Sequence, residues 1–279
     1  VYLNSWCGTP NTGDYSITVT HTDNAEIEAH EGWNLVGNPY PSTLDWDKVE
    51  KIGIDPTLNI WNKNQYSSYV DGVGVNGGSR YIAPNQGFFV KVLQPNDTGE
   101  VRVDNNMRVL TASRFKSGVK RPTVKLKIDN GWSEDEIALK FQSQATDTFD
   151  VGLDALKKFG SDFITQLYTS DTKTKYSINS LPTFEEAVTI PIFIKSQLGG
   201  THTLKLEENL GYYYYLQIDE KLEEFKGDFT LEVPVGESNV MLYILKEEID
   251  FPDPVVDTMT LVDTVTIVDT VTIVDTVTI

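Results

Sequence analysis

Short runs of β-branched and aromatic residues follow one another along most of the chain, and they restrict the fold more than any other feature of the sequence. Side chains in each run tend to alternate in polarity, and clusters of Gly, Asn, Asp and Pro separate the runs. Such runs occur at 14–22, 85–93, 123–128, 136–141, 189–195, 211–219 and 239–245. Strands at this spacing are typical of β-sandwiches and barrels. The sequence therefore predicts an all-β fold built from antiparallel, sandwich-like modules.

Turn-forming and polar stretches divide the chain into four parts. Its 279 residues are enough for two ordinary domains, each with its own core. We expect a first β-rich module over 1–112, a second over 113–248, a proline-containing linker over 249–255 and a repeat tail over 256–279. The chain opens in strand-like alternation without a leader segment, so we expect residue 1 to lie inside a longer precursor.

Helical periodicity is scarce in this sequence. Apolar residues at helical spacing occur at 42–53, at 150–160 and, more briefly, at 184–188. We expect short helices at these places. In the first of them, Ser42 would cap the helix, and Trp46 would pack from its apolar side.

Composition and motifs narrow the range of functions. Asp and Glu number 41 against 23 Lys and Arg, which gives a formal net charge of −18. This charge repels a phosphate backbone and argues against a nucleic-acid partner. The single cysteine, Cys7, excludes an internal disulfide and a metal site made of several thiolates. No apolar run approaches the roughly 18 residues of a membrane-spanning helix. Neither a nucleophile elbow nor a P-loop is present, so we expect that the protein is not an enzyme.

Four stretches of the sequence carry a resemblance to a known group of proteins. They are GWNLVGNPYP at 32–41, NIWNKNQYSSYV at 59–70, YIAPNQGFFVKV at 81–92 and DEIALKFQSQATDTFDVGLDALKKFG at 135–160. In this order they resemble a recurrent segment of large exported surface proteins of the Bacteroidota. The resemblance covers nearly all of residues 8–247. It implies β-rich modules outside the cell or on its surface, commonly exported by the type IX secretion route, that act as adhesins, fibres or accessory parts of secreted enzymes.

The chain ends in four six-residue repeats, a first VDTMTL and then three copies of VDTVTI. In an extended strand, residues six apart share a face and lie about 20 Å from one another. Each repeat also contains Asp-Thr-Val or Asp-Thr-Met, which resembles the O-glycosylation sequon of Bacteroidota exported proteins. This resemblance implies covalent O-glycans on Thr258, Thr264, Thr270 and Thr276, preceded by the sequon acids Asp257, Asp263, Asp269 and Asp275. The alternative is an unmodified β-prone stalk in which Asp prevents stacking between chains.

Aromatic residues near the glycine-rich loop at 72–78 suggest a ligand platform. Trp61, Tyr66 and Tyr69 would form it, and sugars would stack on it. The competing interpretation places the tryptophans Trp33, Trp61 and Trp132 in the core, which we favour. The loop itself resembles a dinucleotide-binding loop only superficially, because no helix follows it.

One acidic stretch is a candidate for metal binding, whereas the three histidines are not. Asp147, Asp150 and Asp154 fall within eight residues, and a hard cation such as Ca²⁺ would suit them. Alternatively, the last two simply begin a helix. The histidines His21, His30 and His202 lack the spacing of metal ligands, and we expect them at the surface.

Two functions from different classes fit these observations. The first is a non-catalytic structural or adhesion protein of the cell surface, with modules next to an O-glycosylated repeat stalk or filament. Its partners would be surface glycans or other proteins, and the tail would associate with itself or with outer-membrane secretion components. The second is a carbohydrate-binding accessory module of a secreted hydrolase. A third alternative, an enzyme whose catalytic domain precedes Val1, depends on sequence upstream.

Overall fold

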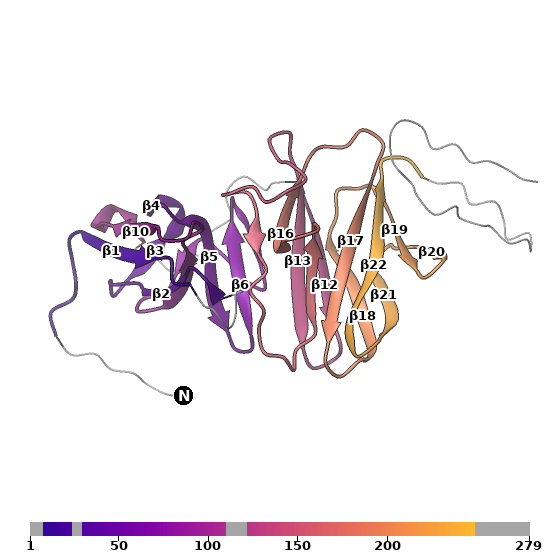
Figure 1. Cartoon of the computed structure of the whole chain (residues 1–279), viewed down its shortest axis with the longest axis horizontal. Coiled ribbons are helices and arrows are strands. Elements are labelled where there is room, and N and C mark those ends of the chain that lie inside the picture. Colours follow the sequence, from indigo (N-terminus) through magenta and orange to yellow (C-terminus); the bar gives the residue numbers. More distant parts are fainter. Residues whose placement is uncertain (1–7, 24–29, 110–121, 249–279) are drawn as a thin grey trace, which may run out of the picture.

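The computed structural model describes residues 8–23, 30–109 and 122–248. This part of the chain is nearly all β, with only one-turn 3₁₀ helices among its described residues, η2 (Trp46–Lys48) and η3 (Asn105–Met107). The all-β fold class is therefore confirmed. Figure 1 shows the strands arranged along the long axis of the molecule, with the N-terminal strands at one end and the C-terminal strands at the other.

The N-terminal region, residues 8–109, contains three small sheets. The first has the order β1 (Tyr15–Thr20), β10 (Thr98–Val103), β4 (Glu50–Ile52). The second has the order β11 (Arg108–Val109), β3 (Thr43–Asp45), β8 (Tyr81–Ile82). The third has five strands in the order β2 (Trp33–Gly37), β9 (Gly87–Lys91), β5 (Asp55–Asn62), β6 (Gln65–Val70), β7 (Val73–Val75).

One hydrophobic cluster joins these three sheets. Trp46 is 1% exposed and packs edge-on against Phe88, with ring centroids 5.5 Å apart. Its indole Nε1 donates a hydrogen bond to the main-chain oxygen of Pro56 at 2.7 Å, so the buried polar atom is satisfied. Every described residue of this cluster falls between Tyr15 and Met107.

The C-terminal region, residues 122–248, is a single large sheet. Its order is β20 (Lys221–Glu224), β19 (Tyr213–Ile218), β22 (Gly236–Leu245), β17 (Ala187–Ser196), β15 (Gln166–Ser170), β16 (Lys175–Leu181), β13 (Glu134–Phe141), β12 (Thr123–Asp129), β18 (Gly200–Glu208), β21 (Asp228–Val233), with β14 (Ala155–Leu156) paired to β16. The pairs are antiparallel except that β13 and β16 run parallel. Side chains from both ends of this strand order share one buried cluster, including Leu204 and Leu242, so the sheet wraps around a single core.

The two large clusters have no described residue in common. The predicted module boundary at 112/113 lies outside the described residues, as do the linker and the repeat tail at 249–279. The proposed division into modules therefore stays a prediction.

The helix predicted at 42–53 is wrong. The segment instead forms β3, η2 and β4. β3 lies between β8 and β11, and this pairing places Leu44 and Trp46 in the core. Ser42 caps no helix, and its hydroxyl accepts a hydrogen bond from Arg108 Nε at 2.7 Å. Strand pairing with distant segments thus overrides a local helical pattern.

The helices predicted at 150–160 and 184–188 are also wrong. The first segment is a turn with Gly152 at φ +83°, followed by the short strand β14. Here the Asp154 carboxylate accepts hydrogen bonds from the main-chain N–H groups of Asp150 and Ser180, which fixes a turn rather than a helix. The second segment leads into β17, which begins at Ala187.

Candidate functional site

The N-terminal and C-terminal regions meet at a junction with an apolar centre. One side comes from the β6–β7 hairpin and the other from β13, β14 and β16. The contributing side chains are Val70, Val73, Val75, Ala138, Ala155 and Ile178, all of them buried. Figure 1 shows β6 facing β16 and β13 at this place. The junction therefore excludes water from a third hydrophobic cluster, separate from the two cores.

Polar groups surround this apolar centre. The Asn76 main-chain N–H donates to Glu136 Oε2 at 2.7 Å, and the Glu136 main-chain N–H donates to Asn76 Oδ1 at 2.9 Å. Asn76 Nδ2 also donates to Asp135 Oδ1 at 2.8 Å. Asn76 has φ +54°, a left-handed conformation that asparagine adopts more readily than most residues. Its position in the turn after β7 thus directs three hydrogen bonds across the junction.

Asp135 is fully buried beside the junction, and its carboxylate is well compensated. Besides Asn76, it accepts hydrogen bonds from the main-chain N–H of Leu167 at 2.7 Å and from the Lys157 ammonium, which is also buried. A second buried lysine, Lys140, contacts the carboxylate of Asp71 at 3.3 Å from across the junction. Buried charges are tolerated when they are paired and hydrogen-bonded in this way.

A third polar contact of the junction joins β5 to the turn before β14. Thr57 Oγ1 donates to the main-chain oxygen of Asp154 at 3.1 Å, and it also contacts Asp55 Oδ1 at 3.0 Å. Burial raises the pKa of Asp55 to about 6, and burial likewise raises the pKa of Asp154 to about 6. The charge of each carboxyl is therefore disfavoured at the place where the two regions touch.

The open side of the five-stranded sheet carries a group of aromatic rings, which we call the aromatic face: Trp33, Trp61, Tyr66 and Phe89. Trp61 and Tyr66 are cross-strand partners with ring centroids 4.9 Å apart, and Tyr66 lies 5.6 Å from Phe89. Trp61 is 44% exposed. The aromatic face thus offers flat apolar surface to a ligand.

Lys158 extends from the C-terminal region over the aromatic face. Its Nζ lies 4.3 Å from the ring centroid of Trp33 and 5.0 Å from those of Tyr66 and Phe89. Burial first, and the charge of Lys91 second, lower the pKa of Lys158 to about 8. Cation–π contact stabilises the ammonium there. A cation held among aromatic rings suits a ligand that has both a flat apolar side and an anionic group.

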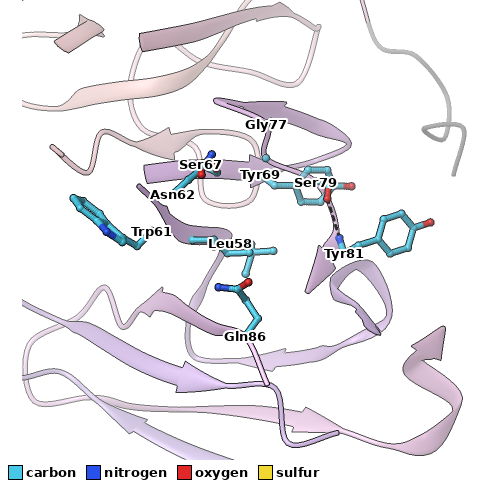
Figure 2. A pocket seen from close by; sticks show the side chains of 11 residues that line it. Leu58, Trp61, Asn62, Ser67, Tyr69, Gly77, Ser79, Tyr81 and Gln86 are labelled. Carbon is cyan, nitrogen blue, oxygen red and sulfur yellow. Dashed lines mark hydrogen bonds between the residues drawn. The ribbon is translucent and has the colours of Figure 1, made fainter. Parts of the chain in front are cut away.

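A pocket of about 230 Å³ opens at the β5–β6 hairpin, on the side opposite the aromatic face. It is lined by Leu58, Ile60, Trp61, Asn62, Ser67, Tyr69, Gly77, Gly78, Ser79, Tyr81 and Gln86. Figure 2 shows the indole of Trp61 directed away from Tyr69 and Tyr81, which lie at the other end of the pocket. Hydroxyl and amide groups make this lining suitable for a small polar ligand.

The predicted platform of Trp61, Tyr66 and Tyr69 is thus divided between two sides of the hairpin. Trp61 and Tyr66 meet on the aromatic face. Tyr69 lies three residues beyond Tyr66 and points to the other side, where it is 6% exposed and its hydroxyl donates to the Asp47 carboxylate at 3.0 Å. Burial raises the pKa of the Tyr69 hydroxyl. The sequence did not reveal Phe89 and Lys158 as neighbours of the platform.

Comparison with known proteins gives a family but no function. The family model of the domain of unknown function DUF8693 matches residues 1–218. This chain belongs to that family. No curated protein and no solved structure matches the chain. Among the described residues, no helix has the length and apolar character that crossing a membrane requires.

The loop of this DUF8693 chain that carries the predicted Ca²⁺ ligands is held by its own hydrogen bonds. Asp150 Oδ2 accepts from the Thr146 main-chain N–H at 2.6 Å, and Asp154 Oδ2 accepts from that of Asp150 at 2.7 Å. Asp147 is exposed, whereas Asp154 is fully buried. The Ca²⁺ site stays a prediction, and the helix start that was its alternative is replaced by this turn.

The predictions for histidine and tryptophan burial are partly wrong. His202 is 1% exposed, and its ring contacts Thr165 Oγ1 at 2.7 Å and the Gly200 main-chain oxygen at 2.8 Å. Trp61 and Trp132 were expected in the core, but they are 44% and 57% exposed. Trp61 is the second-last residue of β5, and Trp132 lies in the turn between β12 and β13.

The glycine-rich loop at 72–78 forms part of the tight β6–β7 hairpin. A Cβ on Gly74 would lie 1.9 Å from the Gly78 main-chain oxygen, and one on Gly78 would lie 2.1 Å from that of Ser68. Close backbone approach therefore explains these two glycines without a nucleotide. The candidate glycosylation sites Thr258, Thr264, Thr270 and Thr276 lie outside the described residues.

Proposed function

We propose that this chain is a non-catalytic structural or adhesion protein of the cell surface, in which the junction makes the two β-rich regions one rigid element. The supporting observation is the junction itself, where a buried apolar cluster is surrounded by the contacts of Asn76, Lys140 and Lys157. Contacts between domains that are free to move are typically smaller and more polar. A rigid element keeps a binding surface at a fixed distance and orientation from its attachment.

The proposal includes the repeat tail and the surroundings in which the protein acts. Extracellular display next to an O-glycosylated stalk or filament follows from the resemblance of the sequence to Bacteroidota surface proteins. Surface glycans or other proteins would be the partners of the folded regions. Secretion components or further copies of the chain would be partners of the tail.

Differential scanning calorimetry of the full chain tests the rigid element. If the junction couples the two regions, they unfold in one transition whose calorimetric and van't Hoff enthalpies agree. Asn76→Ala should separate the unfolding into two steps, whereas the control Asn96→Ala should not, because exposed Asn96 also has positive φ, at 63°. Two transitions in the unaltered chain would refute the coupling.

Carbohydrate binding is the second candidate function, and the aromatic face supports it. Exposed Trp61 would stack on the apolar side of a sugar ring, while Lys158 would contact an acidic group on the neighbouring sugar. The accessory module of a secreted hydrolase would use such a surface to bind its polysaccharide without cleaving it.

Pull-down of the full chain with insoluble polysaccharides, neutral and acidic, tests the second candidate. Trp61→Ala should reduce retention at least tenfold. Trp132→Ala should leave it unchanged, because Trp132 is also exposed, at 57%, but lies in the other region. No sugar should be released during incubation. Equal retention of the two variants would eliminate the aromatic face as the binding surface, and released sugar would contradict a non-catalytic role.

A further inference from the structure

Three potential metal ligands meet between the end of β1 and the start of β2. They are His21, Asp23 and Glu31, and one ligand atom from each lies within 4.8 Å of the other two. Within the described part of the chain, no other three histidine, cysteine or carboxylate side chains come this close together. The group shares no residue with the aromatic face or the junction, although Glu31 lies two residues before Trp33 of the aromatic face.

The main chain around His21 fixes the position of its ring. The His21 N–H donates to the Asp97 main-chain oxygen at 2.9 Å, and the Gly32 N–H donates to that of Thr22 at 3.1 Å. Gly32 has φ +71°, and a Cβ there would lie 2.9 Å from His21 Cδ2 and 2.2 Å from the Val92 main-chain oxygen. The imidazole is therefore packed against backbone that only glycine can provide.

The ring nitrogen that lies next to Asp23 has no hydrogen-bond partner among the described residues. The His21 side chain is 4% exposed, and its Nδ1 is buried with no hydrogen bond in the described part of the chain. Asp23 Oδ1 lies 3.0 Å away, but the contact does not have hydrogen-bond geometry. A buried imidazole nitrogen that lies 3.0 Å from a carboxylate oxygen without a hydrogen bond to it has an arrangement that suits a metal ligand.

We infer that His21 Nδ1, Asp23 and Glu31 form a binding site for a divalent transition-metal ion such as Zn²⁺. Zn²⁺ binds imidazole nitrogen and carboxylate oxygen at about 2.0–2.2 Å, so ligand atoms of one site lie up to about 4 Å apart. The ligand atoms now lie within 4.8 Å of one another, so they would have to approach by at most about 1 Å to reach this spacing. Asp23 is 68% exposed, which leaves the remaining coordination positions to water.

The ligand set also discriminates between ions. Imidazole suits Zn²⁺ and related transition ions, whereas Ca²⁺ and Mg²⁺ prefer sites made only of oxygen. A bound ion would join Asp23 to Glu31 and so fasten the two ends of the connection between β1 and β2. The inference does not depend on the proposed function.

Isothermal titration of the full chain with Zn²⁺ tests this site. One ion should bind per chain, and Asp23→Asn and Glu31→Gln should each weaken binding at least about tenfold. Exposed His30 is the matched control, and His30→Gln should leave the affinity unchanged. The titration is repeated with Cys7→Ser to remove the single thiol as a competing ligand, and with Ca²⁺, for which binding should be much weaker.

Asp23→Asn suits this test because Asp23 is 68% exposed and asparagine keeps its shape, and the contact that the substitution alters is the one with His21 Nδ1. Nuclear magnetic resonance of the imidazole nitrogens gives a second readout: Zn²⁺ should shift Nδ1 of His21 and leave His202 unmoved. Absence of saturable Zn²⁺ binding would overturn the inference. So would equal affinities of the unaltered chain and the Asp23→Asn variant, or loss of binding only with His30→Gln or Cys7→Ser.

Discussion

Asn76 and Glu136 exchange two hydrogen bonds across the junction, each main-chain N–H donating to the other residue's side chain at 2.7 and 2.9 Å. The two residues are 60 positions apart in the chain. This reciprocal pair closes one end of the buried apolar cluster of the junction. Glu136 directly follows the fully buried Asp135. The pair therefore also keeps the Asp135 carboxylate next to its hydrogen-bond donor, Asn76 Nδ2.

Replacing Asn76 should therefore weaken the whole fold. Asn76→Ala removes the side-chain hydrogen bonds to Asp135, Glu136 and Tyr66, and it places alanine at φ +54°. We expect the first unfolding step of this variant to require about 3 kcal/mol less free energy than the single transition of the unaltered chain. Asn96→Ala carries only the backbone cost of about 1 kcal/mol. Urea unfolding followed by tryptophan fluorescence measures both, and equal losses would show that the junction contacts contribute nothing.

Asp55 should make the stability depend on pH. Its pKa is raised to about 6, whereas an unfolded aspartate titrates near 3.9. The folded state thus binds more protons over this interval, and the free energy of unfolding falls as pH rises from about 4 to about 6. Asp55→Asn should remove the contribution of Asp55, a relative gain on the order of 2 kcal/mol at pH 7 compared with pH 4.

Urea unfolding at both pH values measures this gain as a difference between the variant and the unaltered chain. Carboxylates whose pKa is lowered, such as Asp129 and Asp171, also make stability depend on pH. Their contribution drops out of this difference, because both proteins contain them. A difference that does not change with pH would contradict the burial of a protonated Asp55 at the junction.

Lys158 should titrate well below an ordinary lysine. Burial and then the charge of Lys91 lower its pKa to about 8, so the neutral amine is abundant in mildly alkaline solution. Reductive methylation with a ¹³C label and a pH titration by nuclear magnetic resonance would locate this pKa. Lys91→Gln should raise it, while exposed Lys226, which is remote from the aromatic face, should titrate at a high pH. An ordinary value for Lys158 would mean that it does not stay over the aromatic rings.

Mass spectrometry of the tail tests the proposed glycosylation. Peptides from the protein purified from its native source should carry hexose-containing additions on Thr264 and Thr270. Thr266 and Thr272 are in the same repeats but do not follow Asp, so they should be unmodified. Bare Thr264 and Thr270 would leave the tail as an unmodified β-prone stalk.

Local pattern predicted the strands of this fold well, because alternation is a property of neighbouring residues. In the run Gly87–Lys91, for example, Phe88 enters the core and Phe89 joins the aromatic face, as alternation requires. The same local reasoning failed at Trp46. The apolar residues around Trp46 do have helical spacing. Pairing of β3 with β8 and β11 nevertheless gives the residues just before Trp46 an extended main-chain conformation.

The candidate sites could be predicted only in part, because their members are far apart in sequence. Trp61 and Tyr66 were accessible to sequence reasoning as neighbours in one hairpin. Lys158 was not, since nothing near it in the chain shows that it lies over Trp33. Thr57 and Asp154 are 97 residues apart. His21 and Glu31 lack a recognised ligand spacing, and only the folded main chain brings them together.

The distance between the two regions in solution tests the central claim, a rigid element of two β-rich regions, most directly. Spin labels at Gln94→Cys and Val235→Cys, both exposed positions, with Cys7→Ser, allow pulsed electron paramagnetic resonance on the full chain. We predict one narrow distance distribution for this protein and a broad one after Asn76→Ala is added. A broad or multiple distribution in the presence of Asn76 would contradict the claim.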